Sequence, residues 1–227
     1  MTQKPAYDGL ADEYEAFRNV QREYYRPAEE ALRRLLGTGH GRCVDVGCGA
    51  GHFIQVTREL GWLVVGVDQS ADQLRLARSR EPDAELVVAD ATELPFEDAS
   101  FDAGYSTFTH TDVDDFRGAL AETIRVLKPG ARFVYVGNHP CFVGASQERG
   151  EGGIPILHAG YRKSGRVESS AVPGTTPGGW RARLGSFVHV PLEDFLNAFA
   201  GLTLERCEEL EHGTEYPTSI ALAFTKP

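Results

Sequence analysis

Sulfur is scarce in this chain of 227 residues, which contains one methionine and four cysteines. The cysteines, Cys43, Cys48, Cys141 and Cys207, form no C-x-x-C pair and no repeated spacing. A zinc ribbon and a disulfide framework both need such spacing, so the sequence predicts neither of them. We therefore expect four reduced thiols.

Long hydrophobic runs are also missing. No stretch of about 18 apolar residues is present to span a membrane, and residues 1–17 are polar where a secretory signal is apolar. Positively charged residues are also few: the chain has 23 Lys and Arg and 33 Asp and Glu, which gives a formal net charge of −10. We expect a cytoplasmic protein with no membrane span and no nucleic-acid substrate, since an acidic surface repels phosphate backbones.

Apolar runs alternate along the chain with segments of helical spacing, and there is no internal repeat. The runs predict strands at Arg42–Val46, Leu63–Val67, Glu85–Ala89, Phe101–Ser106, Arg132–Val136, Leu202–Cys207 and Ser219–Phe224. Strands that alternate with helices favour a parallel sheet covered by helices on both faces. The expected fold class is therefore α/β, with a Rossmann-like, mostly parallel sheet.

Proline, glycine and serine mark the ends of the expected helices. One helix is expected to open at Pro27 and to stop at Gly37, and Ser70 followed by Gln73 predicts a capping box for another. Residues 138–180 show no helical or strand pattern, and nine of the 25 glycines and four of the 12 prolines fall there. This composition favours a substrate lid, with an ordinary surface loop as the alternative.

The segment Val44–Gly51, with the sequence VDVGCGAG, joins the first strand to the helix that follows it. Glycines at such a turn let a ligand approach the backbone closely, because no Cβ stands in the way. A dinucleotide fingerprint would need a glycine where His52 stands, so a dinucleotide-binding oxidoreductase is a weaker alternative. Asp68 and Asp90 end the next two strands, and carboxylates there line the usual ligand crevice of an α/β sheet.

Five segments, in this order, resemble the motifs of class I S-adenosylmethionine-dependent methyltransferases. They are VDVGCGAG at 44–51, GVDQS at 66–70, VVADATELPF at 87–96, FDAGYS at 101–106 and LKPGARFVYVG at 127–137. Within that class the chain is most similar to the small-molecule branch that resembles the ubiquinone and menaquinone C-methyltransferases. The resemblance implies a seven-stranded sheet with an antiparallel C-terminal strand, and S-adenosylmethionine as the cofactor.

The resemblance also implies which residues hold the cofactor. They are Tyr14, Asp45, Gly47, Gly49, Gly51, Asp68, Gln69, Asp90, Ala91, Ser106 and Thr107. In this pattern the methionine end lies at Asp45 and the glycine turn, Asp68 accepts the ribose hydroxyls, and Asp90 accepts from the adenine amine. Ser106 or Thr107 would lie near the transferred methyl group. Tyr14 would cover the cofactor, with simple packing on the sheet as its alternative role.

Methyl transfer from a sulfonium is a direct displacement, so such an enzyme mainly holds nucleophile, methyl and sulfur in line. A base is needed only where the nucleophile must lose a proton. His110 and His139 are the candidates, because both follow strand ends that should face one crevice and imidazole titrates near neutral pH. Asp114 and Asp115 are interpreted as charges that favour a helix dipole, so no metal site is expected.

The leading hypothesis is an enzyme that moves a methyl group from S-adenosylmethionine to an oxygen, nitrogen or carbon of a small molecule in specialised metabolism. The alternatives are a protein of the same fold that keeps the cofactor without transferring a methyl group, such as a cyclase, and a non-catalytic binding module. A small-molecule substrate is the expected partner, and a homodimer stays open. We expect one domain with four parts: a helical cap (1–40), a cofactor-binding core (41–137), a substrate lid (138–190) and a C-terminal helix with strands (191–227).

Overall fold

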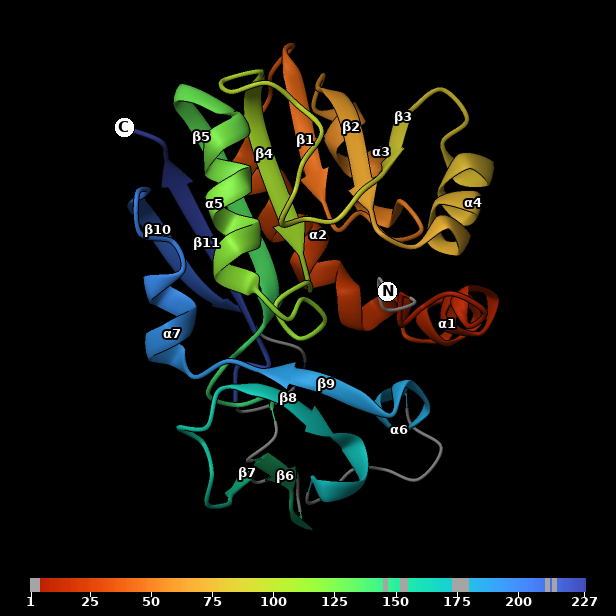
Figure 1. Ribbon diagram of the computed structural model, residues 1–227, viewed down its shortest axis with the longest axis vertical. Helices are drawn as coiled ribbons and strands as arrows, with labels where there is room; N and C mark the ends of the chain where they lie inside the picture. Colours follow the sequence, from red (N-terminus) through yellow and green to blue (C-terminus); the bar gives the residue numbers. More distant parts are fainter. Residues whose placement is uncertain (1–4, 145–146, 152–154, 173–179, 211–212, 214–215) are drawn as a thin grey trace.

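A seven-stranded sheet lies at the centre of the computed structural model, which describes residues 5–144, 147–151, 155–172, 180–210, 213 and 216–227. The strand order is β10-β11-β5-β4-β1-β2-β3 (Figure 1). The strands are β1 (Arg42–Val46), β2 (Leu63–Asp68), β3 (Glu85–Val88), β4 (Phe101–Thr107), β5 (Leu127–Asn138), β10 (Thr203–Leu210) and β11 (Ser219–Thr225). The pairs among β1 to β5 are parallel, whereas β11 runs antiparallel to both β5 and β10. The predicted α/β sheet with an antiparallel C-terminal strand is confirmed.

Helices cover both faces of this sheet, and each face has its own core (Figure 1). The helices are α5 (Phe116–Val126) and α7 (Leu192–Asn197) on one face, and α2 (Arg22–Leu36), α3 (His52–Glu59) and α4 (Ala71–Arg80) on the other. Along β5, Phe133 and Tyr135 belong to the first core, while Val134 and Val136 belong to the second. This period of two is that of a strand buried on both faces.

The start of α2 differs from the prediction. The helix begins at Arg22, and Pro27 lies inside it rather than at its first turn. Tyr25 and Ala28 are both buried on the side that packs against the rest of the molecule. Burial of an aromatic ring stabilises the upstream turn by more than the one backbone hydrogen bond that proline cannot donate. The expected stop is confirmed, since Gly37 ends the helix with a φ of 72°.

The described residues of 147–151, 155–172 and 180–189 form short elements below the carboxyl ends of the parallel strands (Figure 1). The elements are the hairpin β6 (Gln147–Arg149) with β7 (Pro155–Leu157), the pair β8 (Gly165–Glu168) with β9 (Ser186–His189), a 3-10 turn (Ser169–Ala171) and α6 (Trp180–Leu184). Strands of three or four residues are too short to give a detectable alternation in the sequence. The N-terminal helix α1 (Ala11–Val20) contacts α6, with the Tyr14 and Trp180 ring centres 4.7 Å apart.

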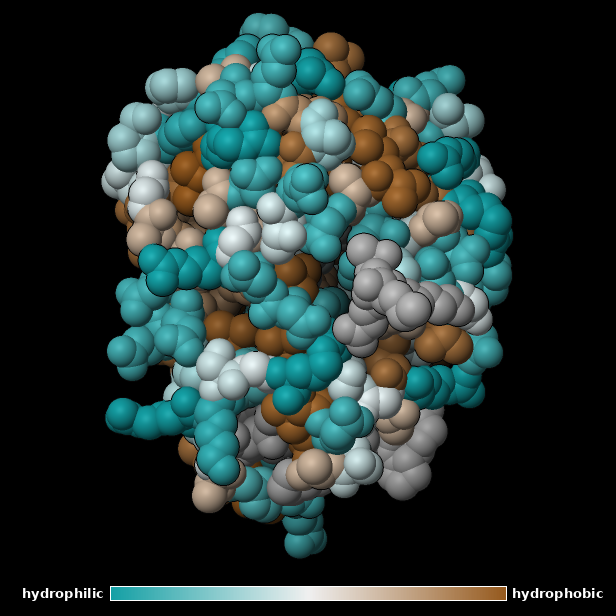
Figure 2. Space-filling model, in the orientation of Figure 1, coloured by the Kyte–Doolittle hydropathy of each residue, from teal (hydrophilic) through white to brown (hydrophobic). Residues whose placement is uncertain are grey.

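Hydrophilic residues dominate the face of the molecule drawn in Figure 2. Within the described ranges, no helix combines the length and the apolar character needed to cross a membrane. All four cysteines are free thiols, and Cys43 and Cys48 are buried.

Candidate active site

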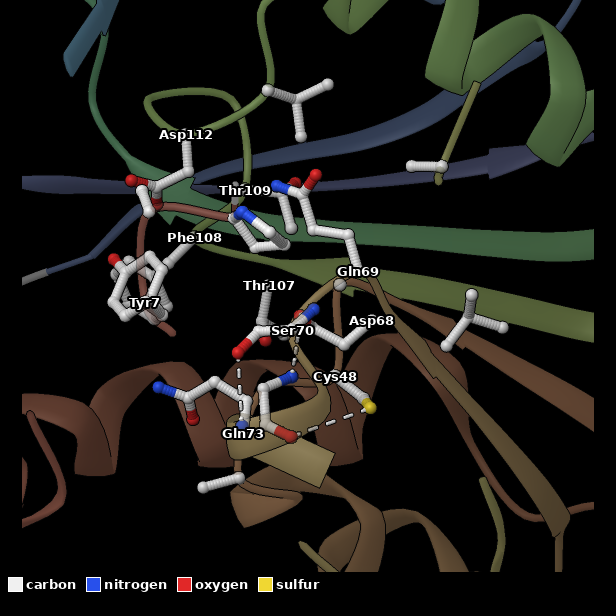
Figure 3. Close-up of a pocket in the computed structure, with 18 of the residues that line it drawn as sticks. Tyr7, Cys48, Asp68, Gln69, Ser70, Gln73, Thr107, Phe108, Thr109 and Asp112 are labelled. Atoms are coloured by element: carbon white, nitrogen blue, oxygen red, sulfur yellow. Dashed lines mark hydrogen bonds between the residues drawn. The ribbon is translucent and has the colours of Figure 1, made fainter. Parts of the chain in front are cut away.

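A cavity of about 930 Å³ opens at the carboxyl ends of β1, β2 and β4. One wall is the sheet edge with its glycine turn, and the other comes from N-terminal residues and from the β8–β9 region. Eight of the residues that the family resemblance implies for the cofactor line it: Tyr14, Gly47, Gly49, Asp68, Gln69, Asp90, Ala91 and Thr107. Residues from four distant stretches of the chain therefore meet in one place, part of which Figure 3 shows.

The glycine turn after β1 has a backbone that other residues would not readily adopt. Gly47, Gly49 and Gly51 have φ values of 77°, 51° and 77°. A Cβ on Gly47 would lie 2.3 Å from Cγ2 of Thr109, so the turn after β4 packs directly against this glycine. The backbone N–H groups of Gly47 and Cys48 donate to the Val67 carbonyl at 2.8 and 2.9 Å. The turn is thus fixed to β2 and presents bare backbone to the cavity.

Asp68 at the end of β2 is held in place by backbone donors. Its Oδ2 accepts from the Gly49 N–H at 2.8 Å, and its Oδ1 accepts from the Ser70 N–H at 2.9 Å. Burial raises the pKa of Asp68, and these two hydrogen bonds act in the opposite direction. Each carboxylate oxygen keeps a further lone pair that can accept from a ligand in the cavity.

The capping box predicted at the start of α4 is only half formed. Ser70 Oγ accepts from the Gln73 N–H at 3.2 Å, as expected. The Gln73 side chain, however, makes no return bond: it is 2% exposed, and neither its amide nitrogen nor its oxygen has a hydrogen-bond partner. Gln73 lines the cavity instead (Figure 3). A buried amide without partners costs free energy, so this position suits a ligand that bonds to it.

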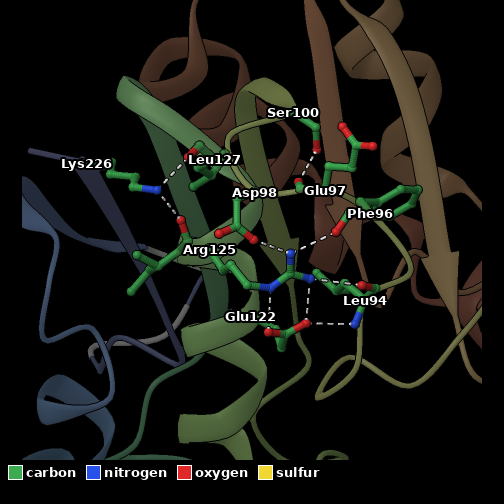
Figure 4. Close-up of polar contacts among 10 residues, drawn as sticks. Leu94, Phe96, Glu97, Asp98, Ser100, Glu122, Arg125, Leu127 and Lys226 are labelled. Carbon is green, nitrogen blue, oxygen red and sulfur yellow. Dashed lines mark hydrogen bonds and ion pairs between the residues drawn. The ribbon is translucent and has the colours of Figure 1, made fainter.

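Asp90 and Ala91 lie near the start of the loop between β3 and β4, and both line the cavity. Oδ1 of Asp90 accepts from the N–H and the hydroxyl of Thr92, both at 2.8 Å, which turns the loop at this point. Further along, the Arg125 guanidinium of α5 donates to the Leu94 and Phe96 carbonyls at 2.9 and 2.8 Å (Figure 4). These contacts attach the loop that carries Asp90 to the body of the protein.

Three residues of the implied cofactor set lie behind the cavity lining. Asp45 is fully buried, pairs in register with Tyr105 of β4, and has no hydrogen-bond partner on either oxygen. Ser106 bonds to the Val46 carbonyl at 2.8 Å and to the Thr109 hydroxyl at 2.7 Å. Gly51 faces α4, where an added Cβ would lie 3.2 Å from the Cβ of Ala77. All three support the cavity wall from beneath.

Neither candidate histidine lines the cavity. His110 is 1% exposed, its Nδ1 lies 2.5 Å from the Tyr135 hydroxyl, and burial lowers its pKa to about 3. His139 is also buried, with Nε2 at 3.0 Å from Glu209, and burial lowers its pKa as well. A position after a strand end does not determine where a side chain points, and here both rings turn away from the crevice. The geometry gives no support to either residue as the base.

Several residues that line the cavity are not in the implied cofactor set, among them Arg18, Phe108 and Asp112. Phe108 directly follows β4 and has a φ of 57°, a strained conformation for a bulky residue that is typical of functional positions. Asp112 lies on the next turn, and Figure 3 shows it on the same side of the cavity as Tyr7. Burial raises the pKa of Asp112 to about 6, while Arg181 and the Tyr7 hydroxyl act in the opposite direction. The acidic run after the fourth strand was the available signal for Asp112.

Comparison with known proteins agrees with this architecture. Residues 44–135 match the family model described as a methyltransferase domain. Over 142 residues the chain is 34% identical to a demethylmenaquinone methyltransferase of Renibacterium salmoninarum. This aligned region covers 60% of this chain and 59% of that protein. It is 40% identical over 129 residues to an O-methyltransferase of Penicillium expansum. That aligned region covers 51% of this chain and 46% of the relative. The chain thus spans between about half and three fifths of the length of these curated relatives.

Solved structures extend the likeness beyond the core. An S-adenosylmethionine-dependent methyltransferase from Mesorhizobium loti superposes with a TM-score of 0.70 at 25% identity, over 89% of this chain and 98% of that one. The sheet order, the glycine turn and the match of residues 44–135 agree with a methyltransferase domain of the class I, S-adenosylmethionine-dependent type. The chain is similar to this class, and within it resembles the quinone methyltransferases.

Proposed function

We propose that this protein transfers the methyl group of S-adenosylmethionine to an oxygen, nitrogen or carbon atom of a small molecule in a biosynthetic pathway. The observation that carries the proposal is that the glycine turn, Asp68 and Asp90 open into one cavity of about 930 Å³. That volume lies near the upper end of the usual range for small-molecule sites and leaves room for an acceptor beside a cofactor. The relatives named as menaquinone and O-methyltransferases support a small acceptor.

The residues present fit S-adenosylmethionine. Gly47 and Gly49 line the cavity with bare backbone, the Asp68 oxygens keep lone pairs for hydroxyl groups, and the Gln73 amide has no internal partner. When bound, the cofactor supplies an electrophilic methyl carbon. In this proposal Asp68 orients the ribose, Asp90 and Ala91 receive the adenine, and Tyr14 with Thr107 shields the reacting end from water.

We propose Asp112, rather than a histidine, as the group that takes a proton from the acceptor where one must be lost. Asp112 lines the cavity on the turn that packs against the glycine loop through Thr109. Its raised pKa, about 6, suits a carboxylate that exchanges a proton near neutral pH. The other cavity carboxylates on this side are engaged: Asp114 bonds to Arg166 at 2.8 Å, and Asp115 caps α5 through the Gly118 N–H.

In this proposal the helical cap (1–40), the core (41–137), the lid (138–190) and the C-terminal part (191–227) act as one methyltransferase domain. We also propose a cytoplasmic location, which the four free thiols support. A second candidate is a protein that binds the cofactor without transferring its methyl group. The solved structure of a [4+2]-cyclase shares the fold at 18% identity and a TM-score of 0.61, and that likeness concerns the fold alone.

The test is to incubate the purified protein with S-adenosylmethionine and a metabolite extract of the organism that encodes it. S-adenosylhomocysteine and new products are then measured by mass spectrometry. We expect extract-dependent release of S-adenosylhomocysteine together with a product heavier by one methylene. An Asp68→Ala variant serves as the control that should lose both signals. Tight cofactor binding without release in any extract would favour the non-transferring candidate instead.

A further inference from the structure

Two charged side chains of α5 hold the loop between β3 and β4 at a single residue, Leu94. Arg125 donates to the Leu94 carbonyl at 2.9 Å, and Glu122 accepts from the Leu94 N–H at 3.0 Å (Figure 4). Arg125 and Glu122 also bond to each other twice, at 2.7 and 2.8 Å. The Leu94 side chain is 3% exposed and belongs to the core on this face of the sheet. Both the backbone and the side chain of Leu94 are therefore fixed.

The two remaining donors of Arg125 reach farther along the same loop. They donate to the Phe96 carbonyl at 2.8 Å and to the Asp98 carboxylate at 2.7 Å. Each of the five N–H groups of this guanidinium thus has an acceptor. The paired bonds to Glu122 also set the plane of the guanidinium, which the point charge of a lysine cannot reproduce. The Arg125–Glu122 pair is consequently a rigid support for the loop.

The support lies close in sequence to the carboxylate that is assigned to the adenine amine. Asp90 is four positions before Leu94, and its carbonyl accepts from the Glu93 N–H at 3.0 Å. Its Oδ1 accepts twice from Thr92, and within the described residues its Oδ2 has no partner. Asp90 is itself exposed, so burial does not hold its carboxylate in place. The position of Oδ2 in the cavity therefore depends on the turn that ends at Leu94.

We propose that Arg125 and Glu122 are positioning residues that set the nucleobase specificity of the cofactor site through Asp90. The inference rests on the proposed function, because it takes this cavity as the nucleoside site. Neither residue belongs to the described lining of the cavity, so both act through the loop alone. A fixed carboxylate bonds to an exocyclic amine and repels a keto oxygen at the same place. A loop free to shift weakens the bond and relieves the repulsion, so the preference for the amine falls.

Calorimetry with two nucleosides tests the proposal without any turnover. S-adenosylhomocysteine carries an amine on the purine ring, and S-inosylhomocysteine carries a keto oxygen at that position. For the wild type we expect the amine to be preferred by about 10- to 150-fold, the effect of one hydrogen bond to a charged group. Arg125→Met and Glu122→Gln should each reduce this ratio of dissociation constants at least about fivefold. A variant that is only less stable weakens both ligands equally and leaves the ratio unchanged.

Lys226→Met is the matched control. Lys226 donates to the Ile124 and Leu127 carbonyls at 2.7 and 2.6 Å, so it supports the end of α5 and the start of β5 rather than the loop (Figure 4). This variant should lower the midpoint of thermal unfolding and keep the wild-type ratio. Asp98→Asn should also keep it, because Asp98 is exposed and the bonds to Leu94 stay in place.

An unchanged ratio in Arg125→Met and Glu122→Gln, with both proteins folded by circular dichroism, overturns the inference alone. If Arg125→Met does not fold, Glu122→Gln decides, because it keeps the size of the side chain and loses one of the two oxygens. A wild type without preference between the two nucleosides overturns the inference as well. Binding of neither nucleoside to the wild type contradicts the proposed function and this inference with it.

Discussion

Three carboxyl groups at or beneath the cavity share one physical property. Burial is the main cause of a raised pKa at Asp45, Asp68 and Asp112, and none of the three forms an ion pair within the described residues. A carboxylate removed from water without a counter-ion costs stability. Groups with such shifted pKa values are concentrated at functional sites, so these three residues are the first choice for mutagenesis of the site.

Asp112→Asn should reduce methyl transfer by about 100-fold or more if Asp112 holds the proton that the acceptor loses. The active form is the ionised carboxylate, whose pKa burial raises to about 6. For the wild type, kcat/KM should therefore be constant above pH 7 and fall about tenfold per unit below pH 6. The pH profile of initial rates, measured with the acceptor identified by mass spectrometry, checks both expectations.

The matched control for this variant is Asp114→Asn, because Asp114 lines the same cavity but is exposed and bonded to Arg166. It should change the rate by less than about threefold, and cofactor affinity should be unaltered in both variants. Equal rates for Asp112→Asn and Asp114→Asn would remove Asp112 from the mechanism.

Asp45 should make stability depend on pH. Burial, with the charge of Asp68 acting in the same direction, raises the pKa of Asp45 to about 8 in the folded state, against about 3.9 in an unfolded chain. Between these values the folded protein keeps a proton that the unfolded chain releases, so stability falls as pH rises. Asp45→Asn should reduce this slope by up to about 1.4 kcal/mol per pH unit. Urea unfolding at pH 5, 6.5 and 8 measures it, and parallel slopes for the two proteins would contradict the assignment.

At the scale of elements, ion pairs join α1 to the core in addition to its aromatic contacts. Glu15 pairs with His52 at 2.8 Å and with Arg80 at 2.6 Å, and Asp12 pairs with Arg75 at 2.5 Å. Glu15 is mostly buried, whereas the Asp12 and Arg75 side chains are exposed. Pairs of the first kind are screened less by solvent than pairs of the second kind. Of these ion pairs, those of Glu15 therefore contribute most to the position of the helix that carries Tyr14 and Arg18.

Glu15→Gln should loosen α1 without affecting the sheet. We expect amide hydrogen exchange in Ala11–Val20 to become about fivefold faster, which corresponds to about 1 kcal/mol, while exchange in β1 and β4 stays the same. Exchange followed by mass spectrometry resolves the two regions. Asp12→Asn is the control and should leave the exchange of α1 nearly unchanged. Uniform acceleration across the sheet would mean that Glu15 stabilises the whole fold rather than the helix.

The elements of the sheet were predictable because a buried strand leaves a continuous apolar run. β1 and β2 agree with the predicted ranges to within one residue, and carboxylates at strand ends meet in the cavity as the topology requires. The remainder depends on packing between distant segments. Pro27 lies within a helix because a buried Tyr25 precedes it, and His110 turns toward Tyr135 instead of the crevice. Neither the position of Pro27 within the helix nor the direction of the His110 side chain can be predicted from the spacing of nearby residues.

At the scale of the whole molecule, the formal charge of −10 should keep the protein away from nucleic acids. Binding to a phosphate backbone requires clustered cations, whereas the 33 acidic residues of this chain outnumber the 23 Lys and Arg. We expect no mobility shift of a DNA duplex or a transfer RNA at about 0.15 M salt and about 10 µM protein. Retention of either at that concentration would contradict this view of the surface. Lowering the salt tenfold should not change the result, since added repulsion opposes binding.

The two walls of the cavity come from different stretches of the chain. Most of the cofactor wall lies within residues 44–135, the part that matches the family model, whereas Tyr7, Tyr14, Arg166 and Leu184 of the outer wall lie outside it. Mutations in the outer wall can accumulate while the nucleoside site stays intact. Substitutions in the outer wall can therefore change which acceptor is bound while the methyl-transfer chemistry is kept. A chimera that carries the outer segments of a relative should accept the substrates of that relative.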